Sequence, residues 1–172
     1  MSLQAVSDLA RRAHAGQIDR LGRDYFRAHL SPIAAGASLF GPTVEAAAWL
    51  HDVIEDTGMT AAGLLAEGVD PLVVAAVESV SRREGEPYEE MIRRASAHPV
   101  GRLVKLVDNA WNIASNPELA TVDPVKAREL LEERYLPARD RLLAAIGINA
   151  CWLGYLELQR VLDGEREALL RK

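Results

Sequence analysis

The sequence has little cysteine, few aromatic residues and no excess of positive charge. A single cysteine, Cys151, among 172 residues excludes an intramolecular disulfide framework and is typical of a reducing compartment. The net charge of −5 argues against a nucleic-acid partner held through its phosphates, which usually requires a basic surface. The N-terminal stretch MSLQAVSDLARRAHAG lacks the apolar core of a signal peptide, and no run of about 20 apolar residues is present to span a membrane. We therefore expect a cytoplasmic protein with neither a nucleic-acid nor a membrane partner.

What the chain does contain is the composition of a helical domain. Ala, Leu, Arg and Glu dominate, and β-branched alternation is nearly absent. The length suits one compact domain, so we predict an all-α, single-domain bundle over residues 1–172. Breaks that contain Gly, Pro, Ser or Asn separate the predicted helices. These helices are residues 4–15, 28–39, 42–56, 60–67, 70–81, 87–97, 99–114, 123–145 and 147–168.

The segment AAAWLHDVIEDTGMT gathers four polar side chains at the end of one predicted helix. They are His51, Asp52, Glu55 and Asp56. Spacings of three and four residues place them on shared helix surface, and no Lys or Arg lies among them. Like charges at these spacings are destabilising, and the C-terminal end of a helix disfavours carboxylates. Gly58 is expected to cap this helix. The cluster predicts a compensating partner, and a bound cation is the leading candidate.

Two further side chains extend this candidate metal site. His29 in AHLSPIA and Asp108 in LVKLVDNAWN each lie beside an apolar helical stretch and can face inward. Imidazole with carboxylate is a suitable ligand set for Mn, Fe, Zn or Ni, whereas Mg tends to prefer oxygen ligands alone. Sequence spacing by itself does not show that these side chains meet. The alternatives are a surface His–Asp pair at residues 51–52 and a helix-start role for His29.

Three stretches of the chain match one family in their order and rough spacing. ARRAHAGQIDRLGRDYFRAHLSPIA resembles an opening segment in which a His-Gly-Gln loop, a basic loop and a Tyr lead to the first metal-ligand His. AAAWLHDVIEDTGMT carries a signature His-Asp followed by Glu-Asp-Thr, and VGRLVKLVDNAWNIAS resembles the segment with the last metal-ligand Asp. Together, over residues 5–115, they resemble the HD-domain metal-dependent phosphohydrolases, and specifically the RelA/SpoT-type guanosine tetraphosphate hydrolases.

The resemblance implies an HD-domain helical bundle that hydrolyses a phosphorylated nucleotide, with guanosine 3′,5′-bispyrophosphate (ppGpp) as the best candidate. The implied ligands of one divalent metal, Mn²⁺, are His29, His51, Asp52 and Asp108. The implied catalytic residues, which orient or deprotonate the attacking water and assist the leaving group, are Glu55 and Asp56. The implied substrate contacts are Asn112 and one of two arginines, Arg20 or Arg23.

The chain departs from the family pattern near the substrate. Leu30 replaces a usual Pro, one extra residue separates Tyr25 from His29, and residues 109–111 lack an Arg and a His. Two other functions therefore stay open: an HD nucleotidase that acts on nucleoside monophosphates, and a catalytically silent metal- or nucleotide-binding module. The number of basic residues near the cleft discriminates between the two enzymes, because a polyphosphate needs more of them.

Three features outside the predicted site receive structural interpretations. His14 is interpreted as a charge complement at a helix C-terminus. Trp111 is interpreted as a core residue. The segment EERYLPARDRL, residues 132–142, is interpreted as an amphipathic core helix, with a homodimer contact as the alternative.

Overall fold

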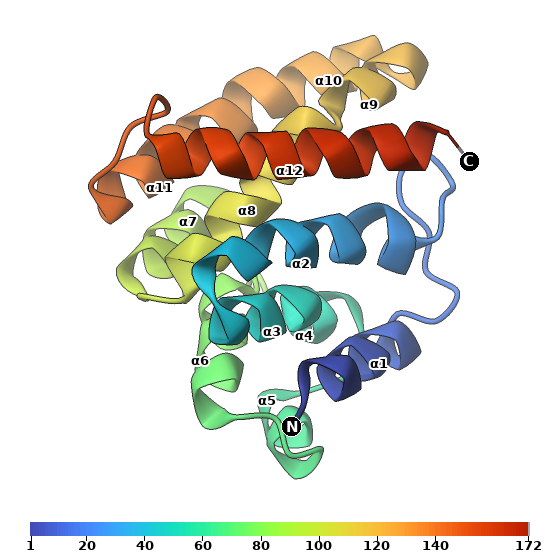
Figure 1. Ribbon diagram of the computed structural model, residues 1–172, viewed down its shortest axis with the longest axis vertical. Coiled ribbons are helices and arrows are strands. Elements are labelled where there is room, and N and C mark those ends of the chain that lie inside the picture. The colour runs from blue at the N-terminus through green and yellow to red at the C-terminus, as the bar shows by residue number, and fades with distance from the viewer. Residues whose placement is uncertain (172) are drawn as a thin grey trace.

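The computed structural model describes residues 1–171, and these residues form a helical bundle (Figure 1). The helices are α1 (Leu3–Ala13), α2 (Ser31–Ala37), α3 (Pro42–Leu50), α4 (Val53–Asp56), α5 (Ala61–Ala66), α6 (Pro71–Val80), α7 (Tyr88–Ala97), α8 (Gly101–Ala114), α9 (Asn116–Val122), α10 (Pro124–Leu130), α11 (Leu136–Ile146) and α12 (Leu153–Leu170). There are also two π-helical turns, here the first π turn (Phe26–Leu30) and the second π turn (Leu131–Tyr135), and a 3₁₀ turn (Ser38–Phe40). Within the described chain, β pairing is limited to an isolated Ile18–Asp24 bridge, so the all-α prediction is confirmed.

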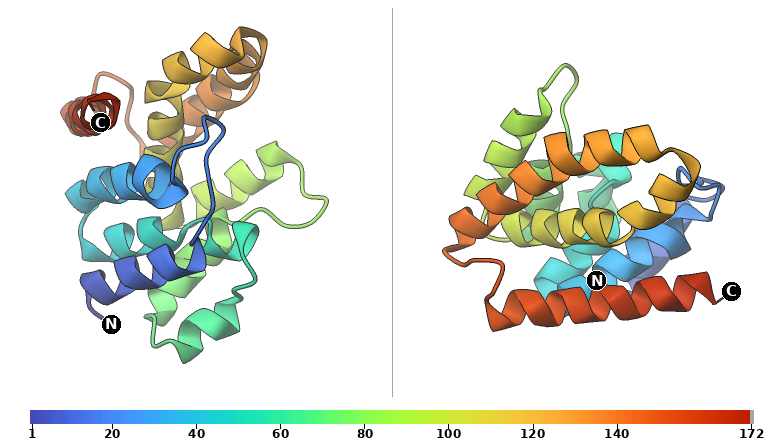
Figure 2. Two further views of the ribbon diagram at one scale, coloured as in Figure 1. Left: turned by 90° about the vertical axis from the view of Figure 1, so that its right-hand side faces the viewer. Right: turned by 90° about the horizontal axis from the view of Figure 1, so that it is seen from above.

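Helix α8 runs through the bundle and is surrounded by other helices (Figures 1 and 2). It contacts α2, α3, α6, α7, α11 and α12. Every residue from 104 to 111 is buried, including the polar Lys105, Asp108 and Asn109. Because buried polar groups require partners, this helix must find them on its neighbours or in a ligand.

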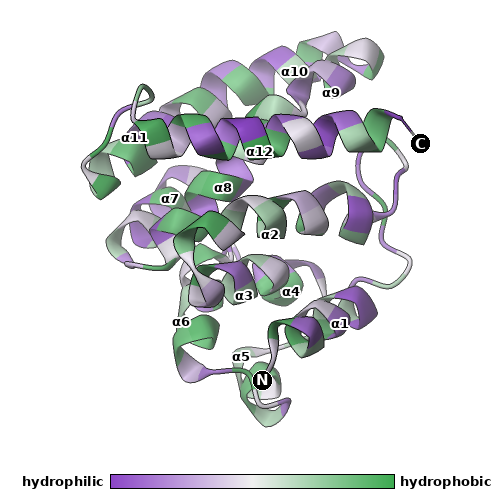
Figure 3. Cartoon of the chain, in the orientation of Figure 1, coloured by the Kyte–Doolittle hydropathy of each residue, from purple (hydrophilic) through white to green (hydrophobic). Residues whose placement is uncertain are grey.

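Helices α1, α3, α2 and α12 lie in successive layers (Figure 1), and each packs against the next. Hydrophobic and hydrophilic residues alternate along α12 (Figure 3). Its buried side chains are Tyr155, Leu158 and Leu162, whose spacings of three and four residues place them on one face. Among the helices of residues 1–171, none combines the length and the apolar character needed to cross a membrane.

Side-chain caps fix the start of several helices. Ser2, Thr60, Asp70 and Asp123 precede α1, α5, α6 and α10. Each side chain accepts a hydrogen bond from a backbone N–H two or three residues later, which satisfies a donor that the helix leaves unpaired. These starts lie within a few residues of the predicted boundaries.

The predicted helix 42–56 is wrong in one respect, because it is interrupted at His51 and Asp52. Helix α3 ends at Leu50 and α4 begins at Val53, with Asp52 at φ −100° and ψ −3° between them. The expected cap at Gly58 is also wrong. Helix α4 ends at Asp56, its cap residue is the extended Thr57, whose hydroxyl donates to the Val53 carbonyl, and Gly58 does not adopt the left-handed conformation of such a cap. His51 and Asp52, at the break, face one cluster of side chains, whereas Glu55 and Asp56 have separate donors.

Two other boundaries differ from the prediction. Residues 115–119 were expected to be a break, yet α9 begins at Asn116, because Pro117 lies in the first turn, where a missing N–H costs nothing. The last helix was expected from residue 147 but begins at Leu153. Gly147 ends α11 in the left-handed conformation, at φ 81°, and a turn follows it.

The predicted helix 123–145 is confirmed as a continuous helical run from α10 through the second π turn to α11. Ala138 and Leu142 are buried in it, and α11 packs against α7 and α8, as expected of a core helix. A homodimer contact on its exposed face stays a prediction.

Candidate metal centre and adjoining pocket

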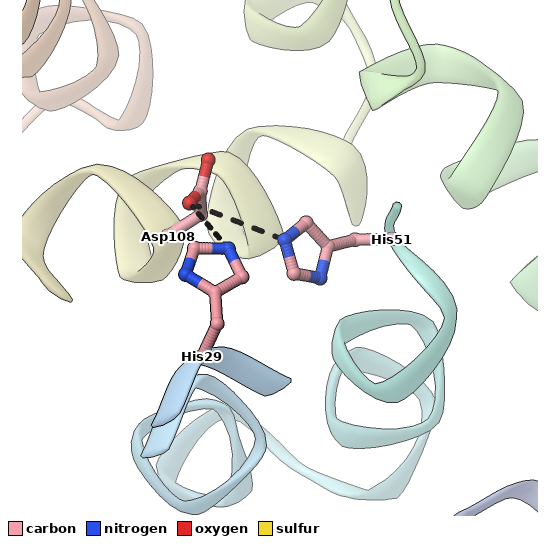
Figure 4. A group of neighbouring side chains, drawn as sticks. All are labelled: His29, His51 and Asp108. Atoms are coloured by element: carbon pink, nitrogen blue, oxygen red, sulfur yellow. Dashed lines mark ion pairs between the residues drawn. The ribbon is translucent and has the colours of Figure 1, made fainter. Parts of the chain in front are cut away.

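His29 lies in the first π turn. The N–H of Ser31 donates to a carbonyl five residues back, where an α-helix would use four. A π turn is the way in which a helix accommodates one additional residue, and such turns are frequent at functional sites. The extra residue that the resemblance implies between Tyr25 and His29 would be accommodated in this way, and the His29 side chain points toward the other predicted ligands (Figure 4).

Pro32 explains why the helix widens here. A proline inside a helix has no N–H to donate, and its ring crowds the carbonyl four residues earlier, which belongs to Ala28. The indole N–H of Trp111 donates to this carbonyl at 3.1 Å. Trp111 is 2 % exposed, so its interpretation as a core residue is confirmed, with an added hydrogen bond that the sequence did not indicate.

Three of the four predicted metal ligands come together from elements far apart in the sequence. His29, His51 and Asp108 each offer one ligand atom, and these atoms lie within 4.8 Å of one another (Figure 4). The Nε2 atoms of His29 and His51 lie 3.6 Å and 4.0 Å from Asp108 Oδ1. The fourth residue, Asp52, adjoins both rings: its Oδ2 is 3.3 Å from His29 Nε2 and 3.0 Å from His51 Nε2.

His51 is held in the tautomer that suits a ligand. Its Nδ1 lies 2.8 Å from the Ala48 carbonyl and donates to it, which leaves Nε2 as the atom directed at the cluster. Nε2 is buried and lacks a well-oriented hydrogen bond, despite the nearby oxygen of Asp52. Burial alone would lower the pKa of His51, but Asp52 and Asp108 outweigh it and raise the pKa to about 9. The two carboxylates therefore favour a positive charge at Nε2, in the form of a proton or of a divalent cation.

Asp52 Oδ2 also receives a third group, the Tyr25 hydroxyl, which donates to it at 2.5 Å. Burial alone would raise the pKa of Asp52, but His51 and His29 outweigh it and hold the pKa well below its usual range. The pKa of Tyr25 is raised by burial and by this carboxylate. Asp52 is thus ionised and Tyr25 stays protonated, as a hydrogen-bonded metal carboxylate requires.

Asp108 is flanked by two residues of its own helix. Lys105 Nζ lies 2.7 Å from Asp108 Oδ2, and Asn112 Nδ2 donates to Oδ1 at 2.6 Å. Burial alone would lower the pKa of Lys105, but Asp108, Tyr88 and Asp52 outweigh it, and the pKa is raised. Lys105 was missed by the sequence reasoning, although its position three residues before Asp108 is the signal that could have found it.

Glu55 and Asp56 have separate hydrogen-bond partners. Glu55 Oε2 accepts from the backbone N–H of Arg82 at 2.8 Å, and Asp56 Oδ2 accepts from Gln17 Nε2 at 2.8 Å. Burial raises the pKa of Glu55, with a contribution from neighbouring carboxylates. The expectation that a cation alone compensates this carboxylate cluster is therefore incomplete, because neutral donors from two distant segments also contribute.

A cavity of about 370 Å³ opens above the cluster. All of the predicted site residues line it except His51, which is buried at 1 % exposure. Its wall also includes residues that the sequence reasoning missed, among them Tyr25, Lys105, Ser115, Asn116 and Tyr135. The volume is in the range of sites for small molecules.

The two candidate arginines differ in their surroundings. Arg23 Nε lies 2.7 Å from Asp19 Oδ2, so its charge is already paired. Arg20 is exposed at the pocket and lies beside Tyr135, where the guanidinium lowers a tyrosine pKa that burial raises. Among residues 1–171, Arg20 is the pocket-lining cation without a carboxylate partner, since Lys105 is paired as well.

Comparisons with known proteins agree with the fold. No family model matches the chain. A probable GTP pyrophosphokinase from Mycobacterium leprae (strain TN) is 31% identical over 140 residues, which cover 76% of this chain and 18% of that protein. The solved structure of a metazoan ortholog of SpoT that hydrolyses ppGpp superposes with a TM-score of 0.67 at 18% identity, covering 97% of this chain and 94% of the other. The chain thus spans about a fifth of its curated relative, has the fold of the hydrolase, and resembles the RelA/SpoT group as its motifs predicted.

Proposed function

We propose that this protein is a divalent-metal-dependent phosphohydrolase, a single catalytic domain that cleaves a phosphate ester or pyrophosphate from a nucleotide. The best candidate substrate is ppGpp. The observation that carries the proposal is the convergence of two imidazole nitrogens, the buried carboxylate of Asp108 and the half-buried carboxylate of Asp52 beside a pocket whose wall holds Glu55 and Asp56. The likeness in fold to a ppGpp hydrolase supports it.

The residues present fit a divalent metal. His29, His51, Asp52 and Asp108 would hold it, and a mixed nitrogen and oxygen set suits Mn²⁺, the metal that we propose. The buried Nε2 of His51, which faces two carboxylates without a well-oriented hydrogen bond, supports this assignment, because a bound cation would take the place of its proton. When bound, the cation would acidify a water molecule and withdraw charge from a phosphoryl oxygen.

Glu55 and Asp56 would orient the attacking water and accept its proton. Each carboxylate has one oxygen engaged by a protein donor, which leaves the other free for water. The raised pKa of Glu55 makes it a stronger base than an exposed glutamate. Protonated Glu55 or Asp56 could then return the proton to the leaving oxygen.

Arg20 and Asn112 are proposed to contact the nucleotide. Arg20 offers an unpaired charge for a phosphate, and Asn112 retains its amide oxygen because its Nδ2 already donates to Asp108. One unpaired cation is few for a doubly pyrophosphorylated nucleotide. This observation favours an HD nucleotidase acting on nucleoside monophosphates as the second candidate. A silent binding module is the third.

The test is hydrolysis of ppGpp by the purified protein with Mn²⁺, beside a panel of nucleoside mono-, di- and triphosphates. We expect manganese-dependent release of pyrophosphate that is lost in Asp52→Ala together with metal binding. Asp8→Ala is the matched control, since Asp8 bonds only Gln4 on the surface of α1. Cleavage of monophosphates alone would favour the nucleotidase, and metal binding without turnover of any nucleotide would favour the binding module.

A further inference from the structure

His14 is a buried titratable side chain to which the proposed reaction gives no role. It caps the C-terminal end of α1 and is 2 % exposed. Its interpretation as a charge complement at a helix end is incomplete, because the ring faces inward and stacks on Tyr25 with centroids 5.5 Å apart. Its Nδ1 lies 2.6 Å from Gln17 Oε1, and its Nε2 is buried without a hydrogen-bond partner.

Gln17 connects this histidine to Asp56. Gln17 Nε2 donates to Asp56 Oδ2 at 2.8 Å, so the amide oxygen must accept from His14 Nδ1–H. The reverse amide orientation would set two acceptor oxygens against each other at the carboxylate. The amide is therefore fixed at both ends, and it holds one oxygen of Asp56.

His14 also supports a second proposed site residue, Asp52, through Tyr25. Its ring packs against Tyr25, whose hydroxyl donates to Asp52. His14 thus lies behind both a proposed metal ligand and a proposed water-orienting carboxylate, yet it contacts neither. Removing a hydrogen-bond partner of a metal-ligating side chain typically changes activity by about 10–100-fold, and we expect an effect of similar size for a partner of Asp56.

We infer that His14 and Gln17 are positioning residues, which aim the Asp56 carboxylate at the attacking water in the hydrolysis proposed above. The inference rests on that proposed function. A purely structural role for the pair would alter stability and leave the rate per folded molecule unchanged. A positioning role changes kcat, leaves KM and metal affinity unchanged, and disappears once Asp56 itself is replaced.

Gln17→Met tests the first step, because methionine fills the space of the amide without donating a hydrogen bond. We expect kcat to fall about 10–100-fold with KM and Mn²⁺ affinity unchanged. Gln4→Met is the matched control, since Gln4 makes the same kind of bond to Asp8 at 3.0 Å on the exposed surface of α1. In an Asp56→Asn background, Gln17→Met should have no further effect on residual turnover. Full kcat in Gln17→Met would overturn the inference.

Two substitutions of His14 separate its hydrogen bond to Gln17 from its packing against Tyr25. His14→Phe keeps a ring against Tyr25 but loses the donor to Gln17, so it should reproduce the kcat loss of Gln17→Met. His14→Asn keeps an N–H near the position of Nδ1 and should restore most of the kcat. If both variants are equally impaired at equal thermal stability, the donor is not what matters and the inference fails.

A nuclear magnetic resonance measurement tests the geometry independently of turnover. The side-chain amide resonances of Gln17 should shift in both His14→Phe and Asp56→Asn, and should not shift in Gln4→Met. Amide resonances insensitive to both substitutions would overturn the inference even in an active enzyme. If the resonances shift but the wild-type protein hydrolyses no phosphorylated substrate, the proposed function fails while the connected side chains stand.

Discussion

The two π turns have the same local structure in different surroundings. Each widens a helix just before a proline: Pro32 follows the first π turn and Pro137 follows the second. Each also receives a side chain of α8 at a backbone carbonyl. Trp111 donates to Ala28 in the first, and Asn109 donates to Tyr135 in the second at 3.0 Å.

They differ in whether the carbonyl four residues before the proline is buried or exposed. Pro32 and Ala28 are buried, so a carbonyl deprived of its helical donor there must be satisfied by the protein. Pro137 and Glu133, four residues before it, are exposed, and water can pair the equivalent carbonyl. The Trp111 bond therefore replaces a missing helical one, whereas the Asn109 bond is an addition. We infer that the first π turn is the constrained one, and it is the turn that presents His29.

Removing the side chain that each turn presents to the pocket should have the largest effect. His29→Ala should abolish tight Mn²⁺ binding and hydrolysis, because the proposed site loses one of two nitrogen ligands. Tyr135→Phe, at the end of the second turn, should leave metal affinity unchanged and alter only KM, since Tyr135 lines the pocket beside Arg20. Calorimetric titration with Mn²⁺ measures the first effect and steady-state kinetics the second. Metal affinity that falls equally in both variants would contradict the distinction between the turns.

The two carboxylates of α4, Glu55 and Asp56, which neither π turn presents, should govern the chemical step. Glu55→Gln should retain the metal and lose about 10²–10⁴-fold in kcat, the range for a general base. Only unprotonated Glu55 can accept a proton, so a raised pKa places the acidic loss of activity above the ordinary glutamate value of 4.5. The pH profile of kcat checks this, and the acidic limb should vanish in Glu55→Gln. Normal turnover in that variant would show that the role assigned to Glu55 is wrong.

Much of the fold could be predicted from the sequence, since the helices follow apolar periodicity and their breaks carry Gly, Pro or capping residues. The features that were predicted wrongly or missed depend on tertiary structure. A proline such as Pro117 in a Ser-Asn-Pro stretch indicates either a loop or a first helical turn, and packing decides which. The π turns carry a weaker signal: an extra residue before His29 with Pro32 three residues on, which gains meaning only once Trp111 is seen at the freed carbonyl.

The candidate site was predictable for the proposed metal ligands and was missed for the residues that support them. His29, His51 and Asp108 were found because the motif spacing carries them. Tyr25 and Lys105 touch the cluster from positions that become neighbours only after folding, apart from the i+3 spacing of Lys105 and Asp108. The spacing of charged residues along one helix predicted crowding of carboxylates. It could not predict the hydrogen-bond donors that come from distant segments of the sequence.

The hydrogen bonds from α8 to the two π turns should differ in their contribution to stability. Trp111→Phe removes the side-chain donor of the buried Ala28 carbonyl, which should cost about 1–3 kcal/mol in the free energy of unfolding, and the smaller ring also packs less well in the space of the indole. Asn109→Leu should cost less than about 1 kcal/mol, because it also removes a buried amide oxygen that has no partner among the described residues. Urea unfolding compares them, and equal losses would indicate that both bonds are equally needed.

The smallest expected effect is the coupling energy between Pro32 and Trp111, which reports on the Ala28 carbonyl separately from the packing of the indole. In Pro32→Ala the new N–H can pair with the Ala28 carbonyl, so Trp111→Phe should cost about 1 kcal/mol less in that background than alone, while the packing cost of the smaller ring stays the same. Asn109→Leu should cost the same with or without Pro137→Ala, because the Tyr135 carbonyl is not the one that this proline deprives. Urea unfolding of the four variants in each cycle measures both couplings. A zero coupling for Pro32 and Trp111 would mean that the indole N–H does not replace the missing helical donor, and that the first π turn is shaped by packing alone.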